Sequence, residues 1–251
     1  MSFSKDDLIN DLERAGFSRH DTVLIHSSMK SIGEVDGGAD TVLDALMEFF
    51  GDEGLLVFPT LSWRLNSENP RFYPEKTASQ VGVLPELFRQ RPGVKRSLHP
   101  THSVAAYGPD AEAFVAGHEL FDTPCARRSP WGKLADRGGK IIFIGTGINC
   151  NTFFHGVDEW SLPREKVFKP VQQTLYVVLG DREMAVLSWR HLPGHSSLFH
   201  LPEPELLAAG ALNDFRFGDA RCRVMAAAPA AETVSEMLKN NPDLFTPEEQ
   251  L

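Results

Sequence analysis

The segment NTFFHGVDEW, residues 151–160, places an imidazole before two carboxylates, directly after an apolar run and a glycine turn. If a helix begins here, Asp158 and Glu159 lie three and four residues after His155, on one helix face. A carboxylate there can hold the imidazole in one tautomer and raise its basicity, as general-base catalysis requires. The pattern also fits a solvated helix start, where the helix dipole favours acids. Both interpretations stay open on these ten residues.

A second stretch, HSSMKSIG at residues 26–33, lies where an apolar run gives way to a loop before a helix. Backbone N–H groups and hydroxyls in such a loop can bind a phosphate, and the helix dipole adds to the attraction. A plain turn of small polar residues is the alternative. The lysine and spacing of a P-loop are absent. In GTGINC, residues 145–150, Cys150 replaces the third glycine of the dinucleotide fingerprint, which indicates a tight turn.

Histidines gather in two further stretches. HPTHS holds His99 and His102, and RHLPGHSSLFH holds His191, His195 and His200. Such clusters can bind zinc, but neither stretch has the HExxH pattern, and prolines interrupt both. We therefore favour structural or substrate-lining histidines over a metal site.

No protein nucleophile is evident in the sequence. There is no GxSxG elbow, and the remaining candidates are Ser27, Ser28 or a cysteine. A base without a protein nucleophile suits direct transfer of a group to a substrate amine or hydroxyl.

The elements that must position these residues alternate in type. Apolar runs predict strands, and helical spacing with glycine stops predicts helices. The expected strands are 22–26, 54–60, 102–108, 140–147 and 221–228, with a hairpin across Gly180 and Asp181. The expected helices are 5–15, 39–51, 83–93, 109–118 and 230–239, and 64–82 is a long loop. This order predicts one α/β domain over residues 1–251, with a central mixed sheet flanked by helices.

Composition restricts the function classes. The net charge of −9 argues against nucleic acid as a partner and suits a cationic small molecule. The three cysteines are far apart and form no CxxC, which argues against a disulfide framework and a cysteine-based zinc site. No apolar run is long enough to cross a membrane, and the N-terminus does not resemble a signal peptide. We expect a cytoplasmic protein without a membrane partner.

Four blocks taken together resemble the aminoglycoside 3-N-acetyltransferases. They are VLIHSSMKSIGEVDGGADTVLDALMEFFGDEGLLVFPT, RSLHPTHSVAAYG, SPWGKL with GGKIIFIGTGINCNTFFH, and GDARCRVM. Their order and spacing match, whereas any one block alone would be weak. The resemblance implies the α/β fold of that family, distinct from the GNAT acetyltransferases, and acetyl-CoA as co-substrate without a metal.

The resemblance also implies roles for particular residues. The loop holding His26, Ser27, Ser28, Met29 and Ser31 is expected to bind the CoA phosphates. Ser103 is expected to lie along the pantetheine arm.

His155 is similar in position to the histidine of the family's N-T-x-x-H block, which implies that it is the catalytic base. The family usually has glutamate three residues later, where this chain has Asp158 followed by Glu159, so either acid could support His155.

The combined hypothesis is acetyl transfer to the 3-amino group of an aminoglycoside within a ternary complex, with His155 taking the proton of the amine. The alternatives are a different amine acceptor and a zinc-dependent hydrolase built from His155, His102 and the histidines at 191–200. A third is a CoA-binding protein without catalysis. A homodimer is compatible with the sequence.

Overall fold

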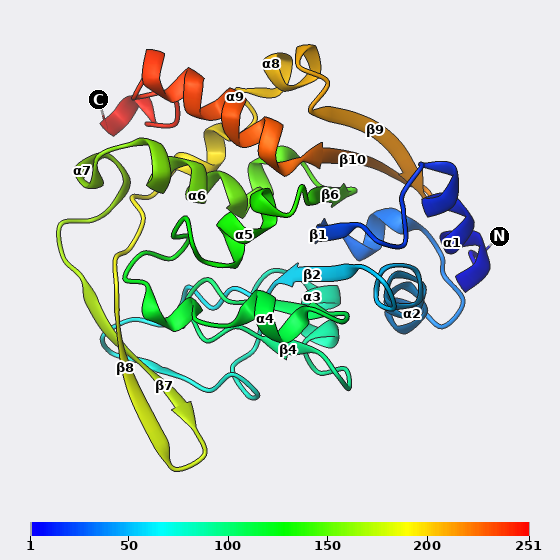
Figure 1. Ribbon diagram of the computed structural model, residues 1–251, viewed down its shortest axis with the longest axis horizontal. Helices are drawn as coiled ribbons and strands as arrows, with labels where there is room; N and C mark the ends of the chain where they lie inside the picture. The colour runs from blue at the N-terminus through cyan, green and yellow to red at the C-terminus, as the bar shows by residue number, and fades with distance from the viewer. Residues whose placement is uncertain (1, 251) are drawn as a thin grey trace.

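The computed structural model describes residues 2–250 and is built around one large mixed sheet (Figure 1). The strand order is β4-β5-β2-β1-β6-β10-β9, with β1 parallel to both β2 and β6 and antiparallel strands on either side. The strands are β1 (Thr22–Ser27), β2 (Leu55–Pro59), β4 (Lys95–Arg96), β5 (Val104–Tyr107), β6 (Lys140–Ile144), β9 (Leu212–Phe217) and β10 (Ala220–Ala226). The expected α/β fold with a mixed sheet is confirmed.

A second sheet has three strands, and two of them, β7 and β8, form a long hairpin that projects from the body of the molecule (Figure 1). It contains β3 (Arg71–Phe72), β7 (Gln173–Leu179) and β8 (Arg182–Ser188). Gly180 takes φ +58° at the two-residue turn, which glycine allows without strain. The predicted hairpin is confirmed. The segment expected to be only a loop, 64–82, contributes β3, which pairs parallel to β7.

The helices lie on both faces of the large sheet. They are α1 (Lys5–Arg14), α2 (Ala39–Phe50), α3 (Val83–Phe88), α4 (Ala111–Val115), α5 (Pro130–Asp136), α6 (Thr152–Ser161), α7 (Arg164–Val167), α8 (Glu203–Ala208) and α9 (Ala227–Asn240). Short 3₁₀ turns are η1 (Met29–Ile32), η2 (His118–Leu120), η3 (Ile148–Cys150), η4 (His195–Leu198) and η5 (Glu248–Gln250). The helices predicted at 83–93 and 109–118 are shorter than expected.

Two apolar clusters form the core, one on each side of the sheet, because successive strand residues point to opposite faces. In β1, Leu24 packs with the cluster under α4, α5, α6 and α9, whereas Val23 and Ile25 pack with the cluster under α1, α2 and α3. Among the helices of residues 2–250, none is long and apolar enough to cross a bilayer.

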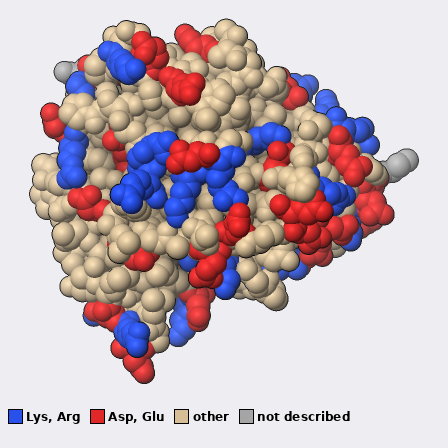
Figure 2. Space-filling view, viewed as in Figure 1, with Lys and Arg blue, Asp and Glu red and all other residues tan. Residues whose placement is uncertain are grey.

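Basic side chains gather near α5 on the face seen in Figure 2. Arg127 bonds Asp136 at 2.9 Å and Arg137 bonds Asp110 at 2.8 Å. Lys133 donates to three carbonyls at the C-terminal end of α4, where the helix dipole favours a cation. The charges of these three residues therefore serve ion pairs and helix capping.

Candidate active site

A cavity of about 460 Å³ opens at the carboxyl ends of the parallel strands. Its walls come from residues 25–27 after β1, from Pro59, Leu61 and Trp63 after β2, and from residues 146–155 after β6. His102 and Phe199 also line it. This edge is where α/β folds commonly bind ligands, because loops from neighbouring parallel strands diverge there.

His155 projects from the first turns of α6 into this cavity. Its ring stacks on that of His191, with centroids 4.3 Å apart and planes 15° apart, and Phe199 meets its other side edge-on at 4.8 Å. The Nδ1 atom is buried and has no hydrogen-bond partner. Burial and then the neighbouring His191 and His195 lower the pKa of His155 well below its usual range. The imidazole is therefore neutral, with one ring nitrogen unprotonated.

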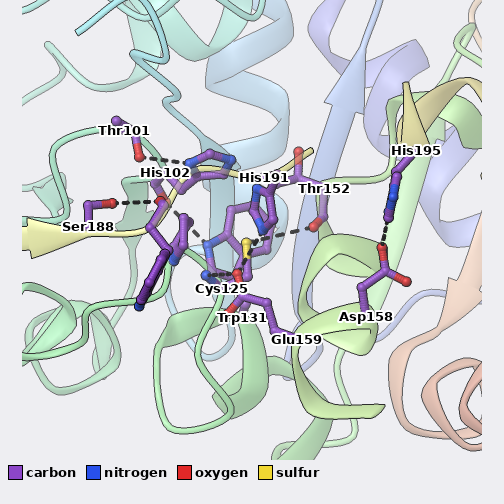
Figure 3. Close-up of polar contacts among 12 residues, drawn as sticks. Thr101, His102, Cys125, Trp131, Thr152, Asp158, Glu159, Ser188, His191 and His195 are labelled. Carbon is purple, nitrogen blue, oxygen red and sulfur yellow. Dashed lines mark hydrogen bonds and ion pairs between the residues drawn. The ribbon is translucent and has the colours of Figure 1, made fainter. Parts of the chain in front are cut away.

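The two acids after His155 contact other histidines, so the geometry gives no support for the direct contact with His155 that was expected of Asp158 or Glu159. Asp158 Oδ2 lies 3.2 Å from Nδ1 of His195, and Glu159 Oε1 lies 2.8 Å from Nε2 of His191 (Figure 3). The segment after β8 folds over α6 and brings these imidazoles to the helix face that carries the acids. Tertiary packing thus replaces the i,i+3 and i,i+4 contacts.

Both carboxyl groups are buried. Burial raises the pKa of Asp158 to about 6, although its bond to His195 opposes the shift. Burial raises the pKa of Glu159 to about 8. Burial also lowers the pKa of His191 to about 3. The Glu159–His191 pair is therefore held together mainly in its uncharged form at neutral pH.

The two histidine-rich stretches meet at this site. His102 lies edge-on to His191 and to His155, with centroid distances of 5.1 and 6.3 Å. His99 is instead fully buried behind them, and His200 is exposed, with its Nδ1 near the carbonyl of Ser197. Only part of each stretch therefore reaches the cavity.

The residues of the loop predicted to bind CoA, 26–31, lie partly at the cavity and partly against the core. His26 and Ser27 line the cavity, and both His26 Nε2 and Ser27 Oγ are buried without partners. Burial lowers the pKa of His26 to about 3, which keeps it neutral. Met29 packs against the apolar cluster beneath α1 and α2. Two polar groups at the base of the loop are thus free to meet a ligand.

The rest of this loop is tied to the end of β6. The Ser28 N–H donates to the carbonyl of Ile144 at 2.8 Å, and Ser31 Oγ lies 3.0 Å from Ser28 Oγ. Gly145 takes φ +60°, and a Cβ at this position would overlap the Ser31 side chain. The close approach of the two loops therefore requires glycine here.

Ser103 does not fit the role expected for it. Its side chain is fully buried and does not line the cavity. The hydroxyl donates to the carbonyl of Thr60 at 2.9 Å and accepts from Nε of Arg96 at 3.1 Å. It therefore ties β5 to β2 and the Arg96 side chain, and the geometry gives no support for a contact with pantetheine.

Sequence reasoning missed several polar groups at the cavity. Thr146 Oγ1 and both amide atoms of Asn151 are buried without partners, and both residues line the cavity. Asn151 is the first residue of the N-T-x-x-H block, and this position beside His155 could have indicated that it lines the same cavity.

A second hollow of about 500 Å³ shares Thr146 with the cavity. Arg216 and Arg221 line it and lie directly opposite each other on β9 and β10. Both are exposed, and neither forms an ion pair with an acid within residues 2–250. Like charges in this register destabilise a sheet unless an anion lies between them.

Comparison with known proteins agrees with this architecture. The family model described as aminoglycoside 3-N-acetyltransferase matches residues 24–239. The aminoglycoside N(3')-acetyltransferase-like protein YokD of Bacillus subtilis is 28% identical over 95% of this chain and 93% of its own length. Aminoglycoside N(3)-acetyltransferase VIII of Streptomyces fradiae is 31% identical over 73% of this chain and 68% of its own.

Solved structures share the fold across almost the whole chain. The crystal structure of YokD superposes with a TM-score of 0.85 at 24% identity, over 97% of this chain and 96% of that one. AAC-VIa bound to sisomicin superposes with a TM-score of 0.82 at 26% identity, over 96% of this chain and 98% of that one. The four sequence blocks, the mixed sheet with its cavity and these matches agree, and the chain belongs to the aminoglycoside 3-N-acetyltransferase family.

Proposed function

We propose that this protein transfers the acetyl group of acetyl-CoA to the 3-amino group of an aminoglycoside. The observation that carries the proposal is a neutral, buried imidazole, His155, at the wall of a cavity in a member of this family. A relative of the same fold binds the aminoglycoside sisomicin. The fold, the cavity and the base together suit an amine acceptor that must lose a proton before it attacks.

Acetyl-CoA approaches from the side of β9 and β10 in this proposal. Its phosphates contact the Arg216 and Arg221 pair, which is exposed and forms no ion pair with an acid of residues 2–250, whereas Asp214 in the same hollow pairs with Arg223. The pantetheine arm then passes Thr146 and enters the cavity near Ser27. Thr146 borders both hollows and keeps a buried hydroxyl free, which supports this route.

His155 acts as the general base. An aminoglycoside amine is mostly protonated in water, so it must transfer a proton before it can attack a thioester. The neutral ring of His155 accepts that proton at the cavity wall, and the ring of His191, held by Glu159, stacks against it and fixes its position. General-base assistance of this kind contributes about 10²–10⁴-fold to a rate.

The acetyl group passes directly between substrates, without an acyl-enzyme. The hydroxyl–imidazole hydrogen bonds Ser97–His118 and Thr101–His102 involve hydroxyls that do not line the cavity. Burial raises the pKa of Cys150, which does line it and so stays a thiol. The amine nitrogen therefore bonds to the thioester carbonyl carbon, the carbon–sulfur bond breaks, and CoA leaves as the thiolate.

The acceptor enters past Trp63, which lines the cavity mouth and is 42% exposed. Its indole face offers apolar contact to a sugar ring while the amines stay hydrated. The excess of acidic residues, with a net charge of −9, adds a general attraction for a polycation.

The zinc-hydrolase alternative needs His102, His155 and the 191–200 histidines around one ion. Within residues 2–250, the set of side chains at metal-binding separation is Cys125, Glu159 and His191, with neither His102 nor His155 among them. The histidines at the cavity wall therefore favour proton transfer over hydrolysis by a bound metal.

The test is CoA thiol release from acetyl-CoA with a panel of aminoglycosides and simple amines. The acetylated position of each product is read by NMR. We expect release only with aminoglycosides that carry a free 3-amino group, and a product acetylated at that nitrogen. Release with simple amines alone, or hydrolysis of acetyl-CoA without an acceptor, would contradict the proposal.

A further inference from the structure

Three side chains with metal-binding atoms converge directly behind the His155 wall. Cys125 comes from the loop before α5, Glu159 from α6 and His191 from the segment after β8 (Figure 3). One sulfur, one carboxylate oxygen and one imidazole nitrogen of this set lie within 4.8 Å of one another. Segments distant in sequence thus bring three different donors to one point.

The donors are buried and incompletely used. The Glu159 side chain is only 2% exposed, and its Oε2 atom is buried without a hydrogen-bond partner. Its Oε1 atom already accepts from the Cys125 N–H at 2.8 Å and faces His191. The Cys125 sulfur has only a long contact, 3.9 Å, with the carbonyl of Thr152. A carboxyl oxygen this deeply buried normally has a partner, so its absence leaves a coordination position open at this point.

The chemistry of the donors selects the ion. A thiolate, an imidazole and a carboxylate together suit zinc, which accepts sulfur, nitrogen and oxygen ligands in tetrahedral geometry. Magnesium and calcium prefer oxygen ligands alone. We propose that Cys125, Glu159 and His191 bind one zinc ion and that this ion inhibits acetyl transfer.

Binding replaces protons with the metal. The thiol of Cys125 releases its proton and forms a sulfur–zinc bond, and the carboxyl of Glu159 binds as the carboxylate. Nε2 of His191 turns from Glu159 to the metal. Three protein ligands leave a fourth position for water.

Inhibition follows from the neighbourhood of His155. The ring of His191 stacks on it at 4.3 Å, so a divalent cation on His191 lies close to the base. Turning Nε2 of His191 from Glu159 to the metal also moves the ring that stacks on His155, so the base loses the contact that holds it at the cavity wall. The inhibitory part of the inference rests on the proposed function, whereas metal binding does not.

Binding is tested without any activity. The protein is dialysed against Zn²⁺ and its metal content is measured, and Co²⁺ is then added in place of zinc to report sulfur ligation by its thiolate charge-transfer absorption. Cys125→Ser is compared with Cys150→Ser, whose thiol lies outside the cluster. We expect one zinc per chain and a cobalt–thiolate band in the wild type and in Cys150→Ser, and neither in Cys125→Ser.

A zinc content or cobalt band that persists in Cys125→Ser would overturn the site, as would a wild type that binds neither ion. Circular dichroism of each variant establishes that the fold is kept, and Cys125→Ala repeats the test with a second side chain. With binding established, zinc is expected to abolish most of the CoA thiol release by the wild type, reversibly with EDTA, and to leave Cys125→Ser uninhibited. Equal inhibition of both proteins would refute the inhibitory role while leaving the transferase proposal intact.

Discussion

Replacing Glu159 with glutamine removes one buried ionisable group and keeps the shape of the side chain. The carboxyl accepts from the Cys125 N–H and pairs with His191, and its side chain is 2% exposed. Burial raises its pKa from an ordinary value of 4.5 to about 8. The folded protein therefore keeps this proton over a range of pH in which the unfolded chain has released it.

The sign of the effect follows from linkage. Where the folded state binds more protons than the unfolded state, each increase in pH lowers the free energy of unfolding. Between pH 6 and about pH 8 the folded state keeps the Glu159 proton that the unfolded chain has already released, and each of these two pH units lowers the free energy of unfolding by about 1.4 kcal/mol. The wild type thus loses about 3 kcal/mol that Glu159→Gln does not lose. Other titrating groups are shared by both proteins and cancel in the difference.

Urea unfolding followed by circular dichroism at pH 6 and pH 9 measures this difference. The control is Glu53→Gln, because Glu53 pairs with His20 at 3.1 Å on the surface, where both side chains are more than half exposed. Between pH 6 and pH 9, we expect the free energy of unfolding of Glu159→Gln to rise by about 3 kcal/mol relative to that of the wild type. Glu53→Gln is expected to show the same pH dependence as the wild type. Parallel pH dependence of Glu159→Gln and wild type would refute the argument that Glu159 is held protonated by burial.

Two further predictions concern the acetyl-CoA side of the site. Arg221→Ala should raise KM for acetyl-CoA by about tenfold, the value of one charge-assisted hydrogen bond, with KM for the aminoglycoside unchanged. Steady-state kinetics measure this change, with Arg182→Ala as the control because Arg182 is an exposed cation on the projecting hairpin. An equal rise in KM for acetyl-CoA in both variants would contradict the prediction. Gly145→Ala should raise KM for acetyl-CoA and cost about 1–2 kcal/mol from the backbone alone, because it adds a clash with Ser31 to a left-handed conformation. The control is Gly138→Ala, because Gly138 also has a positive φ but no atom lies near the position of an added Cβ. Urea unfolding and kinetics of both variants therefore separate backbone strain from the clash with Ser31. A KM increase in both variants would refute the clash with Ser31 as the cause.

Elements with strong local signals could be predicted from the sequence. Helix α1 begins where Ser4 and Asp7 form a reciprocal capping box and ends before Gly16 at φ +78°, so local chemistry fixed both ends. The strands β1 and β6 are apolar on both faces because helices cover each side of the sheet. In contrast, β9 reads LNDFRF, with polar residues at an edge, and its pairing with β10 was not anticipated.

The candidate site was predictable in part. The N-T-x-x-H block located His155 at the cavity, but the partners of Asp158 and Glu159 depend on where the 189–200 segment folds. Helical spacing describes neighbours on one helix and carries no information about a loop that packs across it. Cys125 reaches the same cluster from more than thirty residues away, a convergence that cysteine spacing could not indicate.

The central claim is that His155 accepts the proton of the acceptor amine, and His155→Ala tests it most directly. The measurement is kcat for CoA thiol release together with the Kd for acetyl-CoA. The control is His20→Ala, because the His20 imidazole is 74% exposed and does not line the cavity. If His155 is the general base, His155→Ala lowers kcat about 100-fold or more with little change in Kd, and His20→Ala keeps wild-type values. A kcat for His155→Ala within about threefold of the wild type, below any general-base contribution, would contradict it.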